Sequence, residues 1–275
     1  MTMQNLNKTI AITGLGWLGL PLAQHFITAG HAVRGSVTSK DKAERLAQLN
    51  IGVFVMEISE SGIRGNSKAV LHGAEILIIM IPPGLRRNTG ANYVRKMKHY
   101  LEKIIGAGIP KVVLISSTSV YGDSQGEVSE QHIPQPDTEA GKQLLEVEQL
   151  FFTSAHFDTT IVRFGGLLGG TRQPAKYLSG RKNLQNGKAP VNLIHRGDCI
   201  AILSEIVRQD KFGHIFNAVN PAHPNKEVYY TKMAAELDLE LPHYAAGDTS
   251  ETYKKVHATN LQTELGYKFS FDIYQ

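Results

Sequence analysis

The sequence predicts an α/β protein with a doubly wound parallel sheet and a smaller C-terminal region. Three observations lead to this prediction. Short apolar runs alternate with amphipathic stretches, a glycine-rich turn joins the first run to the first stretch, and the alternation ends after Phe164. The length of 275 residues and the hydrophobic content of 42% are sufficient for a large packed core.

The expected elements can be read in chain order. A strand over 9–13, a helix that ends at Gly30 and a strand over 32–37 form a strand–helix–strand unit. The alternation continues with a helix over 41–50, strands over 53–58 and 76–81, a helix over 91–107, a strand over 111–116, a helix over 139–154 and a strand over 159–164. Later segments are less regular: helical over 199–208, extended over 214–218 and helical over 226–237.

This pattern predicts the domain organisation. We expect one domain over 1–165 and a mixed α/β substrate-binding region over 166–275, with segments near 191–218 returning to the first domain. A homodimer is one assembly that the sequence allows.

Composition excludes several classes of protein. Cys199 is the single cysteine, which rules out an internal disulfide and thiolate-rich metal sites and favours a reducing, cytoplasmic compartment. The 11 histidines form no HxH, HxxxH or HExxH pair, so we expect no metal. The net charge of +4 is too small to indicate nucleic acid, and the apolar run over 76–81 is too short to span a membrane. The stretch over 10–23 resembles a secretion signal, but glycines interrupt it.

Those glycines have the spacing of a nucleotide-binding turn. Gly14, Gly16 and Gly19 follow the first strand and open the first helix, with Trp17 and Leu18 between them. A phosphate needs backbone N–H groups at a helix N-terminus with no Cβ in the way, which this arrangement supplies. We therefore predict a Rossmann-type domain that binds a dinucleotide through this loop; the alternative is a chance glycine turn.

The end of the second strand indicates which dinucleotide is bound. An NAD-preferring site has Asp or Glu there to accept from the ribose hydroxyl, and this chain has none. Ser36, Thr38 and Ser39, with Lys40, instead suit a 2′-phosphate. NADP is therefore the expected cofactor, with NAD as the alternative, although these hydroxyls also suit an ordinary helix cap.

Four further segments carry a family resemblance. They read SSTSVYG over 116–122, VRFG over 162–165, VNLIHRGD over 191–198 and ELGY over 264–267. In these segments the chain resembles, nearly end to end, the extended short-chain dehydrogenase/reductase family of NAD(P)-dependent epimerases and dehydratases. Its GLGWLG, SSTSVYGD and PAHP segments are similar to those of an atypical YeeZ-like group within that family.

The resemblance implies a catalytic set of Ser/Thr, Tyr and a Lys four residues after the Tyr. Ser117 and Lys142 match the first and last members, but Thr138 stands at the tyrosine position. An aliphatic hydroxyl is a poor acid/base because it has no accessible proton comparable to that of a phenol. Tyr121, His195 and water are the alternatives, and either side chain could instead be structural.

The basic character of one segment indicates the charge of the substrate. From Thr159 to Gly197 there is no acidic residue, and the segment contains seven cations: Arg163, Arg172, Lys176, Arg181, Lys182, Lys188 and Arg196. These cations, together with Arg86 and Arg87, would attract an anion, although a solvated loop is equally consistent with them. We therefore expect an NADP-binding oxidoreductase or epimerase/dehydratase-like enzyme acting on an anionic small molecule such as a nucleotide-sugar. The alternative is a catalytically silent NADP-binding sensor or regulatory protein.

Overall fold

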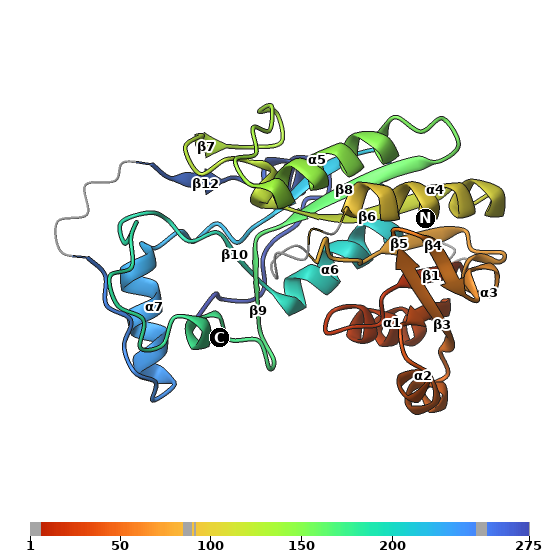
Figure 1. Ribbon diagram of the computed structural model, residues 1–275, viewed down its shortest axis with the longest axis horizontal. Coiled ribbons are helices and arrows are strands. Elements are labelled where there is room, and N and C mark those ends of the chain that lie inside the picture. The colour runs from red at the N-terminus through yellow and green to blue at the C-terminus, as the bar shows by residue number, and fades with distance from the viewer. Residues whose placement is uncertain (1–6, 85–89, 91, 246–251, 275) are drawn as a thin grey trace. The chain divides into compact units, whose positions relative to one another are not determined.

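The computed structural model describes residues 7–84, 90, 92–245 and 252–274, shown in Figure 1. Two compact units divide the chain. The first contains the described residues of Met1–Ser116, Lys142–Val162 and Ile206–His214, and the second those of Ser117–Gly141, Arg163–Glu205 and Ile215–Gln275. The sequence predicted a boundary at residue 165 with segments near 191–218 returning to the first domain; here each unit is assembled from separate segments of the chain, and Ile206–His214 belongs to the first.

The first unit is built on a mainly parallel sheet in the order β8-β6-β5-β1-β2-β3-β4. β1 pairs in parallel with β2 on one side and with β5 on the other, so the strand order reverses at β1 and β5. Ligands of such sheets bind beyond the carboxyl ends of the strands at this reversal. The strands are β1 (Thr9–Thr13), β2 (Ala32–Val37), β3 (Gly52–Ser59), β4 (Gly62–Gly65), β5 (Ile76–Ile79), β6 (Lys111–Ser117) and β8 (Asp158–Phe164).

Helices cover both faces of this sheet. In Figure 1, α1 and α2 lie on one side of the strands and α4 on the other. The apolar faces of these helices pack onto strands whose side chains are almost completely buried, such as those of Ile10, Ile12 and Ile78. The helices are α1 (Gly19–Thr28), α2 (Lys40–Leu46), α3 (Ser67–Leu71), α4 (Tyr93–Ala107) and α5 (Glu139–Phe152), with a 3₁₀ turn over Ala47–Leu49.

The doubly wound α/β prediction is confirmed, with two local corrections. The helix predicted over 41–50 ends at Leu46, because the chain tightens into a 3₁₀ turn and then adopts a left-handed conformation at Asn50 (φ 55°). The sheet is also not wholly parallel. β4, which the sequence did not predict, pairs antiparallel with β3 through a short hairpin.

The second unit contains shorter elements. Its strands include two small parallel pairs, β9 with β10 and β7 with β12, and its helices are most of α6 together with α7 and α8. An apolar cluster that includes Leu168, Val191 and Tyr229 forms its core. The bounds are β7 (Gly126–Val128), β9 (Gly166–Leu168), β10 (Leu193–His195), β11 (Ile215–Ala218), β12 (Lys254–Val256), α6 (Arg196–Arg208), α7 (Lys226–Glu236) and α8 (Thr259–Thr263), with 3₁₀ turns over Thr118–Val120 and Pro174–Tyr177.

Three hydrogen bonds hold the C-terminal segment within this unit. The buried carboxylate of Asp198 accepts hydrogen bonds from the Tyr267 hydroxyl (2.7 Å) and the Ser270 N–H (2.9 Å). The Tyr229 hydroxyl donates to the carbonyl of Ile273 at 2.8 Å. Because a buried polar group left without a partner destabilises the fold, these bonds hold the tail in one register.

The described residues include no helix that is long and apolar enough to cross a membrane. Over the same part of the chain, no three His, Cys, Asp or Glu side chains gather as a metal site would require.

Candidate cofactor and substrate sites

The glycine loop connects β1 to α1 in the first unit, and two of its glycines are required by the protein itself. Gly14 has a φ of 103°, and a Cβ there would lie 3.2 Å from the carbonyl oxygen of Met80. A Cβ on Gly19 would lie 2.1 Å from the carbonyl oxygen of Gly14. These positions must be glycine for the turn to close.

Gly16 differs, because the protein gives no reason for it to be glycine. Its φ is outside the left-handed region, it is exposed, and a Cβ there would meet nothing within 4 Å. The adjoining helix α1 starts at Gly19, its N-cap residue Leu18 makes no side-chain cap hydrogen bond, and its first turn contains no acidic residue. An open approach to a backbone at a helix N-terminus is what a pyrophosphate requires, so these residues fit a dinucleotide. Trp17 is partly exposed beside this approach.

The three hydroxyls predicted near the ribose have different roles. Ser36 is buried, and its Oγ accepts a hydrogen bond from the Gly14 N–H (3.2 Å), so it supports the loop. Ser39 caps α2 by accepting from the Lys42 N–H at 3.4 Å. Thr38 is exposed directly after β2 and is free of such a contact among the described residues. The first carboxylate after β2 is Asp41, in the first turn of α2.

In the second unit, Ser117 and Tyr121 flank the 3₁₀ turn that follows β6. The Ser117 Oγ accepts from the Ser119 N–H at 3.2 Å, which leaves its own proton available for donation. Tyr121 is fully buried, and its hydroxyl lies 2.9 Å from the Ser129 carbonyl oxygen and accepts from Arg163 at 2.7 Å. Burial raises the pKa of Tyr121 above its usual value of 10. These contacts agree with the structural alternative for this tyrosine.

Thr138, at the expected tyrosine position, stands immediately before α5. Its Oγ1 accepts a hydrogen bond from the Gly141 N–H at 3.1 Å, which is the geometry of a helix N-cap. Lys142 follows on α5, and its side chain is exposed and has no partner among the described residues. The threonine therefore begins the helix that carries the lysine.

The other alternative acid/base, His195, is held by packing. Its ring stacks on Phe271 with centroids 4.4 Å apart, and its Nδ1 lies 3.1 Å from the Gly197 N–H. Partial burial lowers the pKa of His195 below 6.5, so the neutral ring predominates near pH 7.

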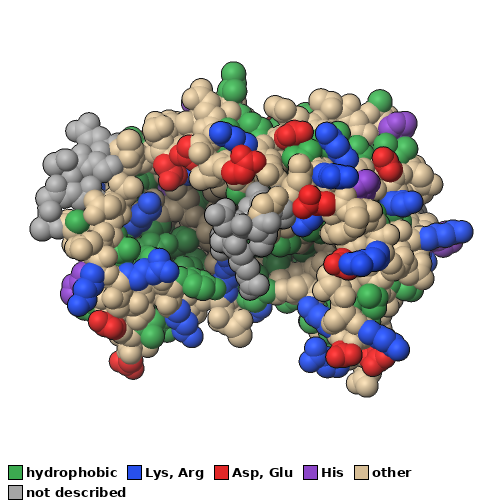
Figure 2. All heavy atoms as spheres, viewed as in Figure 1, with side chains coloured by type: hydrophobic (Ala, Val, Ile, Leu, Met, Phe, Trp, Pro, Cys, Tyr) green, Lys and Arg blue, Asp and Glu red, His purple; other side chains and the backbone are tan. Residues whose placement is uncertain are grey.

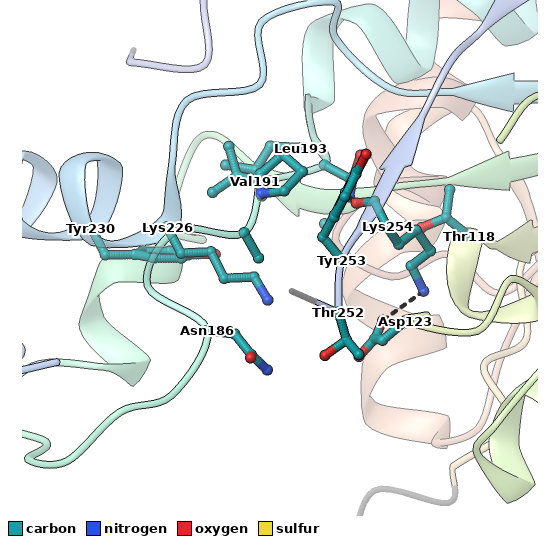
Figure 3. Close-up of a pocket in the computed structure, with 14 residues that line it drawn as sticks. Thr118, Asp123, Asn186, Val191, Leu193, Lys226, Tyr230, Thr252, Tyr253 and Lys254 are labelled. Atoms are coloured by element: carbon teal, nitrogen blue, oxygen red, sulfur yellow. Dashed lines mark hydrogen bonds and ion pairs between the residues drawn. The ribbon is translucent and has the colours of Figure 1, made fainter. Parts of the chain in front are cut away.

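A pocket of about 210 Å³ lies entirely within the second unit (Figure 3). Its charged lining consists of Lys226 at the start of α7, Lys254 on β12, and Asp123. Hydroxyl and amide groups come from Thr118, Asn186, Asn192, Tyr230, Thr252 and Tyr253, and the remaining lining residues are small or apolar.

The cations of this pocket are not those that the sequence singled out. None of the seven predicted cations is among its described lining residues. Arg163 instead turns inward to Tyr121. Arg86 and Arg87 lie outside the described residues. The sequence analysis did not predict Lys226 and Lys254, because they belong to segments without a recognisable motif. The one signal that could have pointed to Lys226 is its position at the start of a helix.

Comparison with known proteins identifies the family. A family model described as NAD(P)H-binding matches residues 14–208, from the first loop glycine to the end of α6. The chain belongs to this NAD(P)H-binding family. It is also 32% identical to Protein YeeZ of Escherichia coli K12 over 265 residues, which are 96% of each chain. The predicted resemblance and the NAD(P) cofactor are therefore confirmed.

Solved structures extend this NAD(P)H-binding fold to nearly the whole chain. MoeE5 in complex with UDP-glucose and NAD has a TM-score of 0.78 at 20% identity, covering 98% of this chain and 95% of that one. A UDP-glucose 4-epimerase from Thermotoga maritima has a TM-score of 0.76 at 18% identity, with 97% and 95% covered. At these identities the likeness shows the fold alone.

Proposed function

We propose that this protein is an NADP-dependent enzyme of the oxidoreductase or epimerase/dehydratase type that acts on an anionic small molecule. The observation that carries the proposal is Gly16, whose glycine serves no need of the fold and suits an approaching pyrophosphate. The end of β2 supports NADP over NAD, because exposed Thr38 and Lys40 stand where NAD-preferring sites have a carboxylate.

The substrate is an anion held in the second-unit pocket, whose lining includes Lys226 and Lys254. MoeE5 and the Thermotoga maritima epimerase were both solved with UDP-glucose, which makes a nucleotide-sugar a candidate here. When bound, the nicotinamide cofactor supplies hydride transfer. Of the chain's own residues, Ser117 would donate a hydrogen bond to a substrate carbonyl and Lys142 would hold the ribose. The proton must come from a group other than Thr138, whose hydroxyl caps α5.

The second candidate is a catalytically silent NADP sensor. Two observations favour it: Thr138 serves as a helix cap, and the Tyr121 hydroxyl is buried among protein partners. In this case the cofactor would bind without turnover.

Fluorescence titration tests the cofactor. Losing charge-assisted bonds to the 2′-phosphate costs about 1.5–3 kcal/mol, so NADPH should bind roughly 10- to 150-fold more tightly than NADH at matched salt. Thr38→Ala should weaken NADPH binding and leave NADH binding unchanged. Equal or tighter binding of NADH by the natural protein would overturn the NADP assignment.

A turnover screen then separates the enzyme from the sensor. Aldehydes, ketones, sugar acids and nucleotide-sugars are tested with NADP⁺ or NADPH. For an active substrate, Ser117→Ala should lower kcat by roughly 10²- to 10³-fold, the usual effect of losing a donor to a developing oxyanion. Thr138→Tyr places a phenol four residues before Lys142 and should raise activity in an enzyme, but not in a sensor. Tight NADPH binding without turnover in either the natural protein or Thr138→Tyr would favour the sensor.

A further inference from the structure

Within the described part of the chain, one lysine of the second-unit pocket has no anionic partner. Lys226 begins α7, where its backbone N–H donates to the Ala189 carbonyl at 2.9 Å and its side chain is half-buried. Among the described residues no carboxylate lies within ion-pair distance of its ammonium group. A charge partly removed from water is unfavourable without a partner, so this position suits an anionic ligand.

The second lysine of the pocket is already neutralised. The Lys254 Nζ lies 3.0 Å from Asp123 Oδ1 and donates to the Tyr121 carbonyl oxygen at 2.6 Å. Its side chain is 13% exposed, whereas that of Asp123 is 71% exposed. Two lysines and one aspartate give the described lining a net charge of +1, and the uncompensated part belongs to Lys226.

The rest of the lining favours a hydroxylated ligand. Figure 3 shows the Lys226 ammonium group, the Asn186 amide and the Thr252 side chain turned toward the same space, while Lys254 is turned toward Asp123. Tyr230, Tyr253 and Thr118 also belong to the lining. The volume of about 210 Å³ is below the roughly 300–1,000 Å³ of pockets that enclose drug-sized molecules.

We propose that Lys226 is the specificity-determining residue of this pocket and that the ligand is a small polyhydroxy acid with a single negative charge. Its carboxylate lies on the Lys226 ammonium group, and its hydroxyls meet the amide and hydroxyl groups of the lining. The proposal rests on the function proposed above, because it assigns the substrate to the same pocket. It narrows the substrate class from nucleotide-sugars, whose pyrophosphate carries two charges, to acids such as a hexuronate.

Calorimetric titration of the full chain tests this assignment. The probes are D-glucuronate, neutral D-glucose, glucose 6-phosphate and UDP-glucose, all at one ionic strength. Glucuronate should bind most tightly. Lys226→Met should weaken glucuronate binding by roughly 10- to 150-fold, as expected for losing a hydrogen-bonded ion pair, and should leave the much weaker binding of glucose unchanged. Lys226→Arg should retain most of the affinity.

Lys268→Met is the matched control, because Lys268 is an exposed lysine of the same unit outside the pocket lining. It should bind glucuronate as the natural protein does. Tighter binding of UDP-glucose or glucose 6-phosphate than of glucuronate would overturn the proposal, as would equal losses in Lys226→Met and Lys268→Met. So would the absence of glucuronate binding by folded protein.

Failure of the proposed function gives a different result. If glucuronate binds through Lys226 but is not turned over with NADP⁺, the ligand assignment stands and the enzyme proposal fails. If NADPH binds and is turned over with a nucleotide-sugar while glucuronate does not bind, the enzyme proposal stands and the Lys226 assignment fails.

Discussion

Substitution of Gly16 separates a glycine needed by a ligand from one needed by the fold. In Gly16→Ala the new methyl group meets nothing within 4 Å, and the backbone is already in a region that alanine adopts. Removing glycine's freedom in the unfolded chain should stabilise the protein by about 0.4–1 kcal/mol, which corresponds to a rise in Tm of roughly 1–4 °C for a chain of this size. The methyl group would nevertheless occupy the approach of the pyrophosphate to the loop. Loss of one charge-assisted hydrogen bond would weaken NADPH binding roughly 10- to 150-fold, and Gly16→Val should weaken it further.

Gly19→Ala is the control with the opposite expectation. Its Cβ would be placed 2.1 Å from the Gly14 carbonyl oxygen, so the backbone must shift. Overpacking of this kind costs about 1–3 kcal/mol, and the variant should melt at a lower temperature with or without cofactor. Thermal melting and NADPH fluorescence titration are carried out on the natural protein, Gly16→Ala, Gly16→Val and Gly19→Ala. If Gly16→Ala melts like the natural protein and binds NADPH with the same affinity, the cofactor does not lie on this loop and the reasoning is refuted.

Three further outcomes are expected. Thr138→Val removes the hydroxyl that caps α5 at Gly141, so the free energy of unfolding should fall by about 0.5–2 kcal/mol in a denaturant titration. Its effect on turnover should be far smaller than that of Ser117→Ala. An unchanged stability would contradict the cap. Asp123→Asn releases Lys254 and raises the net charge of the described pocket lining to +2. The affinity for glucose 6-phosphate should then rise up to about fivefold relative to that for glucuronate, a modest gain because Asp123 is exposed. An unchanged ratio of the two affinities would refute the charge count. Burial lowers the pKa of His223 below 6.5, so at mildly acidic pH the unfolded chain binds more protons than the folded one. The Tm should therefore fall as the pH drops from about 6.5 through the lowered pKa. If Tm depends on pH as steeply in His223→Gln as in the natural protein, other groups cause the effect.

Much of the first unit could be predicted from the sequence because its signals are local. Alternating apolar and amphipathic segments determine β1, α1 and β2, and the turn between the first two needs glycines at fixed spacing. The hairpin of β3 and β4 has no such signal. β4 is a four-residue edge strand with two glycines, which is too short to show a period. Apart from the predicted return of segments near 191–218, the division into two discontinuous units also has no local signal, since it depends on which segments pack together.

The pocket of the second unit could not be predicted from the sequence for the same reason. Asp123, Asn186, Lys226 and Lys254 come from four separate parts of the chain, and nothing in the spacing of the sequence brings them together. The run of seven cations was a stronger pattern but a less informative one, because a count of charged residues does not show which way their side chains point. Arg163 belongs to that run and is buried against Tyr121, so its charge serves the core of the second unit.

Thr138 stands where the family resemblance implies a tyrosine, and its contacts at the start of α5 account for the threonine. The start of α5 is tightly packed: a Cβ on Gly141 would lie 2.3 Å from the Ser119 carbonyl oxygen, and the threonine hydroxyl holds the Gly141 N–H from the other end. The threonine at position 138 is therefore explained by its role as the N-cap of α5, which does not require it to transfer a proton. Gly16 and Lys226, in contrast, each make the unliganded protein less stable than a simple replacement would, the first through chain entropy and the second through a half-buried charge. A chain that only had to fold gains nothing from either. Ligand binding would offset both costs, which is why we propose an NADP-type dinucleotide at Gly16 and a small acid at Lys226, with chemistry that depends on the hydroxyl of Ser117.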